Sequence, residues 1–380
     1  MLGSPDNGVP VMQTRAARQR RIVMPLLIAL VVGVIALLLT GRGQQTQLLG
    51  SGSTLAQPLI ERSITDFRNS VAADNPDQRG DTGRDWVLDG SGIDYEPVGS
   101  LGGILRLSDP EVDFAISDYP LSKAALGERD LVQFPLALGA IAVVHNLDLA
   151  EGQTLRLDAP TLAGIYRGRI TRWNDTALVK LNPDAGLPDL AINAVHRTDG
   201  SGSTLGFTAY LAGGSREWAD GPGSNSLVEW PAGAGAERSG GLLSAVQGTA
   251  GSIGYAEQGQ AVRAGLRLAE LKNASAAYTL PGSVSMRAAT ADHDWSGDDD
   301  YVGPLTVAKS AEAYPMTVAV YAVTRRAPQA EGDTRRTLRY LSFVLDRYDG
   351  TAEDLGYLPL PAAAVDDVKA YWADNLAFSP

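Results

Sequence analysis

One hexapeptide, Gly-Ser-Gly-Ser-Thr-Leu, occurs twice in this chain of 380 residues, at 50–55 and again at 200–205. Each copy follows a segment that can form a strand and precedes apolar residues with helical spacing. The first N–H groups of a helix have no partner within that helix, and the helix dipole adds partial positive charge there. Glycine lets the backbone approach a ligand, and Ser and Thr add donors. The repeat therefore indicates two half-sites that close on one oxyanion.

Other interpretations of this hexapeptide are weaker. A single copy is often a flexible loop or a plain helix N-cap. Neither copy has the lysine of a Walker A motif, so nucleotide binding is not expected. The nucleophile-elbow pattern does not fit around Ser201. Two copies in a strand–turn–helix context favour anion binding.

The composition excludes several classes of site. The chain has no cysteine, which excludes disulfides, thiolate metal sites, a cysteine nucleophile and a lipoprotein anchor. The net charge of -12 argues against a nucleic-acid partner. It does not argue against binding of a small anion, because such binding depends on nearby hydrogen-bond donors and not on the total charge. His145, His196 and His293 are far apart and show no ligand spacing, so we expect neither a metal nor a cofactor.

The N-terminal part has the pattern of a membrane anchor. Residues 1–21 are polar and end in a basic cluster, and residues 22–41 contain no charge and are rich in Leu, Ile and Val. This length is sufficient to span a bilayer, and the positive-inside rule places the N-terminus in the cytoplasm and the rest outside. A cleaved signal peptide is the alternative. The long apolar run and the lack of a clear A-x-A site favour an uncleaved anchor with a tether at 42–47.

The first globular part begins near Leu48 and has an α/β pattern. Strands are expected at 93–98 and 112–118, and a third hydroxyl-bearing glycine turn at 99–103. The apolar run Phe134–Asn146 is typical of a strand covered on both faces in a parallel sheet. Alternating strands and helices indicate an α/β fold, whose ligand lies beyond the carboxyl ends of the strands. Residues 69–92 are polar and predict a long loop or small insertion of undetermined role.

The second part, from about Leu147, continues this pattern. We expect helices at 161–166 and 242–247, a strand at 192–197 that leads into the second hexapeptide, and a long loop at 213–241. A glycine turn at 248–255 leads into another strand. An apolar strand at 314–324 and helices at 334–348 and 362–375 complete the chain.

The residues around the second hexapeptide can form an anion site. The guanidinium of Arg197 can bind two oxygens of a tetrahedral anion, and Asp199 can hold it in orientation. Hydroxyls of Ser201, Ser203 and Thr204 and the N–H of Gly202 add donors. The alternative is a surface Arg–Asp pair beside a helix cap, which is common.

A carboxylate at the end of a strand, Asp118, predicts which anion is bound. Phosphate near neutral pH carries a proton and can donate a hydrogen bond to a carboxylate, whereas sulfate cannot. Enzyme sites that need a polar partner reject analogues lacking it by roughly 10⁴-fold or more. An ordinary strand-end or cap residue is the alternative for Asp118.

The chain resembles the periplasmic phosphate-binding proteins of the high-affinity phosphate ABC transporter. The resemblance extends from about Leu48 to the C-terminus and includes the glycine turn at 99–103. The other matching motifs are GSGSTLAQPL (50–59), DFAISDYPLS (113–122), FPLALGAIAVVHNL (134–147), LAGIYRGRITRWND (162–175), LNPDAGLP (181–188), RTDGSGST (197–204) and GTAGSIGY (248–255). So many motifs in family order are far more specific than one glycine turn.

The resemblance implies a two-lobed α/β fold of type II with crossover strands and phosphate held between the lobes. Residues 48–146 and 317–380 would form lobe I, and residues 147–316 lobe II. The protein would catalyse no reaction, act as a monomer and deliver inorganic phosphate to an ABC permease. The implied phosphate-binding residues are Thr54, Leu55, Ser100, Asp118, Arg197, Ser201, Gly202 and Ser203, with Asp199 pairing Arg197.

The sequence departs from the family pattern at a few positions. Leu55 stands where an aromatic residue is usual, Leu101 replaces a common Ser, and Ser203 replaces Thr. Two other functions remain as alternatives. A phosphatase with Ser201 or Thr54 as nucleophile would need a nearby base or metal, and the sequence offers no such cluster. A tethered sensor fits the anchor, but only 21 residues would lie in the cytoplasm to carry a signal.

Overall fold

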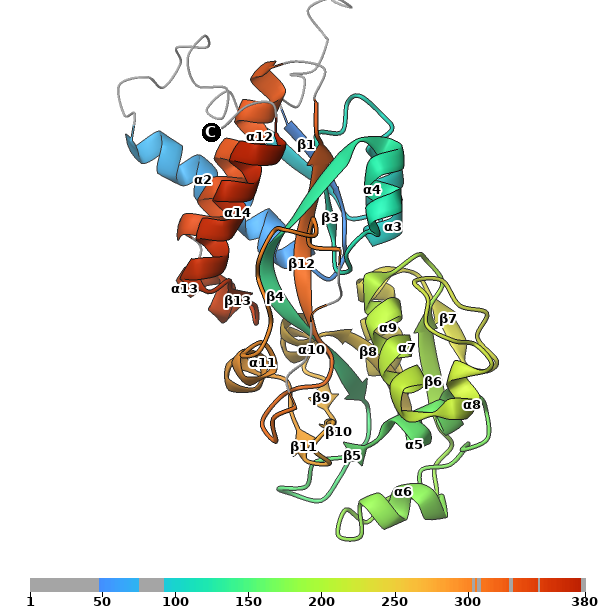
Figure 1. The fold of residues 1–380 in the computed structure, drawn as a ribbon. Coiled ribbons are helices and arrows are strands. Elements are labelled where there is room, and N and C mark those ends of the chain that lie inside the picture. The colour runs from blue at the N-terminus through green and yellow to red at the C-terminus, as the bar shows by residue number, and fades with distance from the viewer. Residues whose placement is uncertain are drawn as a thin grey trace, which may run out of the picture. The chain divides into compact units, whose positions relative to one another are not determined.

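The longest strand, β4 (Leu131–His145), is buried along all of its 15 residues and connects the two halves of the fold (Figure 1). This computed structural model describes residues 48–74, 92–302, 305, 309–327, 331–347 and 349–376. Leu, Val, Ala and Ile make up most of β4, as expected for a strand with apolar neighbours on both faces. The apolar run therefore predicted the strand correctly.

The expected parallel pairing of this strand is wrong. In the described part of the chain, the four strands that pair with β4 all run antiparallel to it, namely β8 (Ser252–Glu257), β9 (Arg267–Leu268), β12 (Thr317–Arg325) and β13 (Leu358–Pro359). Burial on both faces, and not parallel pairing, accounts for the apolar run, because helices of both lobes pack around this crossover strand.

Parallel strands flank the antiparallel centre on both sides. β1 (Leu48–Gly52) lies between β2 (Ile93–Glu96) and β3 (Phe114–Ser117), and is parallel to both. β6 (Asn193–Arg197) lies between β8 and β7 (Ala234–Ala236), again in parallel. Among the described residues the strand order is β2-β1-β3-β12-β4-β8-β6-β7. The early part of β4 pairs with β12, and its last five residues pair with β8. β4 thus passes from a first lobe into a second.

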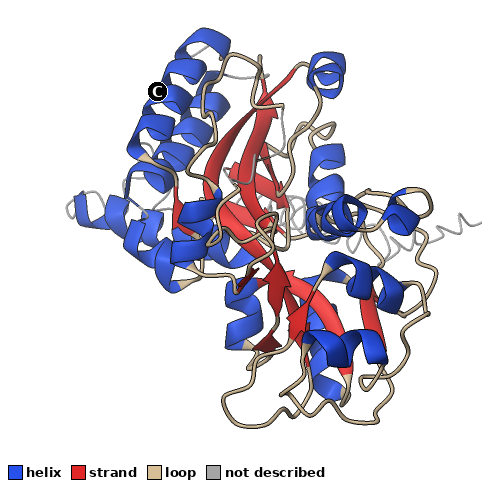
Figure 2. Cartoon of the chain, turned by 60° about the horizontal axis from the view of Figure 1, so that its bottom comes forward, coloured by secondary structure: helices blue, strands red, loops and turns tan. Residues whose placement is uncertain are grey.

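Helices cover the strands of each lobe (Figures 1 and 2). The helices before β4 and after β12 are α2 (Gln57–Asp74), α3 (Ser100–Arg106), α4 (Lys123–Arg129), α12 (Glu331–Arg347), α13 (Asp349–Asp354) and α14 (Ala362–Asn375). The helices between β4 and β12 are α5 (Ala159–Tyr166), α6 (Thr176–Leu181), α7 (Gly202–Gly214), α8 (Arg216–Ala219), α9 (Arg238–Gly248), α10 (Gln258–Arg263) and α11 (Ser283–Ala289). β10 (Glu270–Lys272) pairs with β5 (Arg156–Leu157) and β11 (Tyr278–Thr279) in a small separate sheet.

Aromatic side chains fix the helices of the first lobe against the sheet. Phe67 of α2 packs edge-on to Tyr340 of α12, with ring centroids 5.6 Å apart. Phe134 of β4 makes the same kind of contact with Trp372 of α14 at 5.0 Å. Such aromatic pairs stabilise a core by about 0.5–1.5 kcal/mol beyond their area burial. The helix predicted at 362–375 is confirmed as α14, and its Trp372 packs on β4.

Several expectations need correction or fall outside the described residues. Residues 69–74, expected in a loop, form the end of α2, while residues 75–91 are not described. The expected loop at 213–241 contains α8, β7 and the start of α9, and the Ser215 hydroxyl caps α8 by accepting from the Trp218 N–H. The expected membrane segment, 22–41, lies outside the described residues. None of the helices that the structure describes is both long and apolar enough to cross a membrane.

A buried carboxylate, Glu257, begins α10 where the two lobes meet. Its oxygens accept hydrogen bonds from the N–H groups of Gly259 (2.6 Å) and Gln260 (2.7 Å). Nη2 of Arg263 is 3.9 Å away, and the Tyr357 phenol also faces the carboxylate. Burial nevertheless raises the pKa of Glu257 from 4.5 to about 7.

This pKa predicts a pH dependence of stability. Between about pH 4.5 and pH 7 the folded protein holds a proton on Glu257 that the unfolded chain has released, so this group lowers stability as pH rises. We expect Glu257→Gln to remove that dependence. Urea unfolding of the wild-type protein and of Glu257→Gln at pH 5, 6, 7 and 8 gives the difference between their free energies of unfolding at each pH. A difference that stays constant over this range would contradict the assignment.

Candidate anion-binding site

The two identical hexapeptides have different local structures. In the first copy, Gly50, Ser51 and Gly52 form the end of β1 and pair with β3. In the second, β6 ends at Arg197, before the hexapeptide, and α7 already begins at Gly202. Both copies lie between a strand and a helix, as expected, but the hexapeptide occupies a different part of that unit in each copy. Sheet pairing on both sides keeps the first copy extended, whereas the second copy has left the sheet and can cap a helix.

The first copy provides a turn between β1 and α2. The hydroxyl of Ser53 accepts a hydrogen bond from the Ala56 N–H at 3.1 Å, which caps the turn. The N–H groups of Thr54 and Leu55 have no hydrogen-bond partner among the described residues. The Leu55 side chain is buried. Leu55 can therefore offer a ligand its backbone N–H and not its side chain, which explains how an aliphatic residue can stand at this position.

The second copy provides the N-terminus of α7. The hydroxyl of Ser201 accepts from the Thr204 N–H at 3.3 Å and caps the helix. The N–H groups of Gly202 and Ser203 have no partner within the described part of the chain. The Thr204 hydroxyl, a further expected donor, instead lies 2.8 Å from the Tyr255 hydroxyl. The open end of this helix therefore offers two N–H groups and partial positive charge.

Asp118, which follows β3, connects the two lobes. Its Oδ1 accepts a hydrogen bond from the Ser100 hydroxyl at the start of α3, and its Oδ2 accepts from the Ser203 hydroxyl at 3.1 Å. A Cβ at Gly202 would lie 2.2 Å from Oδ1, so glycine is needed there for the carboxylate to reach the end of α7. The carboxylate thus lies against the first two residues of that helix.

Arg197 lies buried at the end of β6, with 2% of its side chain exposed. Nε donates to Oδ1 of Asp199 at 2.7 Å, and Nη2 donates to Oδ2, which makes a two-point ion pair. Burial alone would raise the pKa of Asp199, but the hydrogen bonds and charge of Arg197 bring it below its ordinary value. The Asp199 carboxylate is therefore charged at neutral pH and fixes the plane of the guanidinium.

Aromatic packing supports the backbone of Arg197. The Tyr255 hydroxyl accepts from the Arg197 N–H at 3.1 Å. Burial raises the pKa of Tyr255 to about 12, so the phenol keeps its proton. Its ring stacks on Phe207 of α7 with centroids 4.4 Å apart. One tyrosine therefore links β8 and α7 to β6.

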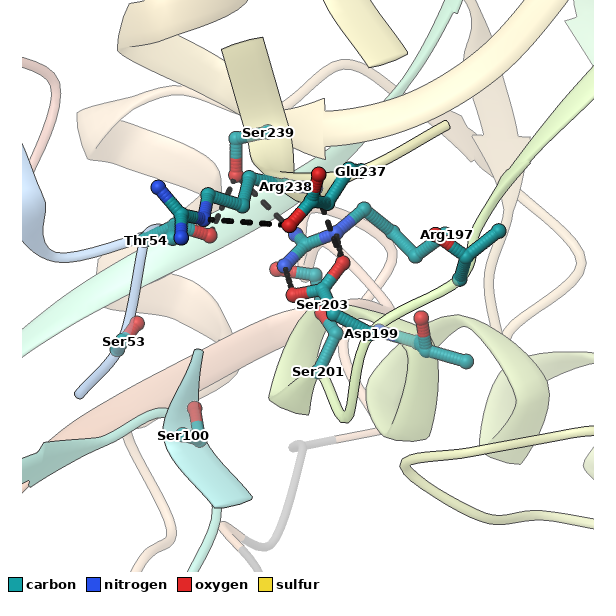
Figure 3. Close-up of polar contacts among 12 residues, drawn as sticks. Ser53, Thr54, Ser100, Arg197, Asp199, Ser201, Ser203, Glu237, Arg238 and Ser239 are labelled. Atoms are coloured by element: carbon teal, nitrogen blue, oxygen red, sulfur yellow. Dashed lines mark hydrogen bonds and ion pairs between the residues drawn. The ribbon is translucent and has the colours of Figure 1, made fainter. Parts of the chain in front are cut away.

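Ser239, on the first turn of α9, is a site residue that sequence reasoning missed. Nη1 of Arg197 donates to its hydroxyl at 3.2 Å, and the Thr54 hydroxyl lies 2.9 Å from the same oxygen (Figure 3). This serine therefore joins the first-lobe turn to the second-lobe arginine. A serine in a glycine-rich segment 42 positions after Arg197 carries no local signal of this role.

The structure brings the nine expected residues together. Hydrogen bonds link Thr54 to Arg197 through Ser239, Arg197 to Asp199, and Ser100 to Ser203 through Asp118; Leu55, Ser201 and Gly202 adjoin these residues in the two turns. Figure 3 shows the Thr54, Arg197 and Asp199 side chains converging from separate elements. Among the described residues no group of three or more His, Asp or Glu side chains could hold a metal ion. The arrangement suits a small oxyanion.

Comparison with known proteins identifies the family. The sequence pattern of the PBP superfamily domain matches residues 40–347. The phosphate-binding protein PstS of Xylella fastidiosa (strain 9a5c) is 34% identical over 332 residues, covering 87% of this chain and 86% of that protein. This chain belongs to the PstS family of phosphate-binding proteins. PstS 3 of Mycobacterium tuberculosis (strain H37Rv) is 30% identical over 352 residues and covers 87% of this chain and 94% of that protein.

Solved structures of phosphate-binding proteins share the fold of this PstS-family chain. A high-affinity periplasmic phosphate-binding protein, solved with phosphate, superposes with a TM-score of 0.65 at 20% identity, covering 88% of this chain and 96% of the other. The phosphate-binding protein of Stenotrophomonas maltophilia has a TM-score of 0.62 at 18% identity, covering 86% and 94%. The predicted two-lobed α/β binding-protein fold is confirmed.

The position of Ser239 predicts its effect on anion binding. We expect Ser239→Ala to weaken binding of the anion by roughly 5- to 30-fold, because one hydroxyl contacts both the buried Arg197 and the opposite lobe. Isothermal titration calorimetry measures this change. Ser244→Ala, at an exposed position of the same helix, is the matched control. Equal dissociation constants for the two variants would show that the Ser239 bridge does not matter.

Proposed function

We propose that this protein binds inorganic phosphate between its two lobes and delivers it to an ABC permease. The observation that carries the proposal is the position of Asp118 beside the N-terminus of α7. A carboxylate in a site built from N–H groups, hydroxyls and an arginine repels a fully deprotonated anion and accepts a hydrogen bond from an anion that carries a proton. Phosphate does so near neutral pH. The names of the PstS relatives describe phosphate-binding proteins and no reaction.

Each site residue has a proposed role. The N–H groups of Thr54 and Leu55 donate from the first lobe, and those of Gly202 and Ser203 donate from the second. Arg197 binds with its guanidinium, held in orientation by Asp199. The hydroxyls of Ser100 and Ser203, which donate to Asp118, turn to the phosphate oxygens, and Ser201 caps α7. Many fixed donors around a desolvated anion account for affinity without any catalytic group.

We assign residues 48–146 and 317–380 to lobe I and residues 147–316 to lobe II. Support comes from the pairing of β4, which changes from β12 to β8 within the strand. The two connected lobes would open and close about this crossover as phosphate enters and leaves. Contacts from Asp118 to Ser203 and from Thr54 to Ser239 link the two lobes directly.

Asp118 provides the test of ligand identity. We expect Asp118→Asn to bind phosphate roughly 10- to 100-fold more weakly, since a hydrogen bond to a charged group is lost. The same variant should gain sulfate binding, because the amide can donate where the carboxylate could only repel. Calorimetric titration of the full-length protein with phosphate, arsenate and sulfate measures both effects.

The control for the loss of charge is Asp148→Asn. That carboxylate is fully exposed, and its ion-pair partner is Arg267, which is not one of the proposed site residues. It should leave all three titrations unchanged. Absence of phosphate binding by the wild-type protein would overturn the proposed function. Unchanged selectivity in Asp118→Asn would overturn the role of Asp118 alone.

We further propose that residues 22–41 anchor the protein in the cytoplasmic membrane as a monomer, with residues 42–47 as a tether and the lobes outside the cytoplasm. The basis is the uncharged apolar run that follows a basic cluster. We expect the full-length protein in the membrane fraction and a variant lacking residues 1–41 in the soluble fraction. N-terminal sequencing of the full-length protein should give Met1 or Leu2. A soluble protein whose sequence begins after residue 41 would show cleavage instead.

A further inference from the structure

Three successive carbonyl oxygens of the first turn are each held by a side chain. The Ser53 carbonyl accepts from the Tyr95 hydroxyl at 2.9 Å. Nε2 of Gln260 donates to the Thr54 carbonyl at 2.9 Å and to the Leu55 carbonyl at 3.0 Å. The Tyr357 hydroxyl donates to that same Leu55 oxygen at 2.6 Å. All three of these carbonyls are therefore fixed from outside the turn.

Fixing a carbonyl also fixes the N–H group that follows it. A trans peptide is planar and carries its C=O and N–H on opposite sides. The Ser53 carbonyl thus sets the direction of the Thr54 N–H, and the Thr54 carbonyl sets that of the Leu55 N–H. Both of these N–H groups lack a hydrogen-bond partner among the described residues. Tyr95 and Gln260 therefore point both donors away from themselves.

Gln260 reaches this turn from the other lobe. It lies on α10, which follows β8 directly. α10 nevertheless packs against the C-terminal part of the chain, since a Cβ at Gly259 would lie 1.9 Å from the Leu355 carbonyl oxygen. Nη1 of Arg263 donates to that oxygen at 3.0 Å. The helix that carries Gln260 is thus fixed beside the crossover of the two lobes.

The opposite end of Gln260 is also fixed. Its backbone N–H donates to the buried Glu257 carboxylate at 2.7 Å. Both hydrogens of its side-chain amide have acceptors in the turn, so the amide can take one orientation only. Tyr95 is equally constrained, because its ring is buried and burial raises the pKa of its phenol well above the ordinary value. Both side chains keep their donor hydrogens.

We propose that Tyr95 and Gln260 are positioning residues for phosphate binding. Neither side chain contacts the anion; each orients a backbone N–H that does. This inference rests on the proposed function, since it assigns the Thr54 and Leu55 N–H groups to phosphate. It also explains why an aliphatic side chain is sufficient at Leu55, where the peptide group alone acts on the ligand.

The test compares variants that remove one donor each. Tyr95→Phe keeps the ring and loses the hydroxyl, and Gln260→Leu keeps the approximate volume and loses the amide. We expect the dissociation constant for inorganic phosphate to rise about 3- to 10-fold in Tyr95→Phe and about 5- to 30-fold in Gln260→Leu. Calorimetry on the full-length protein in detergent gives the constant and the number of binding sites. Stopped-flow measurement should assign the change to faster dissociation.

Matched controls remove the same kind of bond elsewhere. The Tyr314 hydroxyl donates to the Ile141 carbonyl at 2.8 Å, and Nε2 of Gln247 donates to the Ala264 carbonyl at 3.0 Å. Tyr314→Phe and Gln247→Leu should therefore leave the phosphate dissociation rate unchanged. A folding defect would instead lower the number of competent sites while the remaining protein binds normally.

The outcomes separate this inference from the proposed function. Faster phosphate dissociation in Tyr95→Phe and Gln260→Leu, but not in the controls, supports the positioning roles. Wild-type binding with unchanged rates in both test variants overturns this inference and leaves the proposed function intact. A wild-type protein that binds no phosphate overturns both. If Gln260→Leu does not fold, Gln260→Glu replaces it and is compared together with Tyr95→Phe. An unchanged phosphate dissociation rate in these two variants overturns the inference.

Discussion

The buried Arg197 is the group on which the site depends. A guanidinium with 2% of its side chain exposed must be paired, because an unpaired buried charge is strongly destabilising. Asp199 provides the charge and Ser239 an additional acceptor, and both leave the guanidinium fixed in one plane. The neighbouring Tyr255 supports the backbone from behind. The fold therefore presents a preoriented cation to an anion even though the whole protein carries a net charge of -12.

The two lobes contribute different kinds of donor. The second lobe offers a helix N-terminus, where unpaired N–H groups and the dipole arise from the helix itself. The first lobe offers a turn whose N–H groups have no such source of order and depend on Tyr95 and Gln260. The two identical hexapeptides thus provide N–H donors through different local structures. The neighbouring strands account for this difference in local structure. β2 and β3 pair with the first copy and keep it extended, whereas β6 ends before the second copy begins.

Local patterns in the sequence predicted much of the fold and most of the candidate site. Arg197, Asp199 and the start of α7 lie within a few residues of one another, so motif and chemistry coincide there. Asp118 was identifiable as a strand-end carboxylate. The role of Ser239 was not, because its partners Thr54 and Arg197 are 185 and 42 positions away. The antiparallel pairing of β4 was missed for a similar reason, since burial determines apolar composition and strand direction does not.

The most direct measurement is a crystal structure of the full-length protein with inorganic phosphate. The account predicts one tetrahedral anion between the lobes, within hydrogen-bond distance of the Arg197 guanidinium and of the Thr54, Leu55, Gly202 and Ser203 N–H groups. One of its oxygens should lie within hydrogen-bond distance of an Asp118 carboxylate oxygen. A phosphate bound to residues of one lobe only, or one that does not approach Asp118, would contradict it.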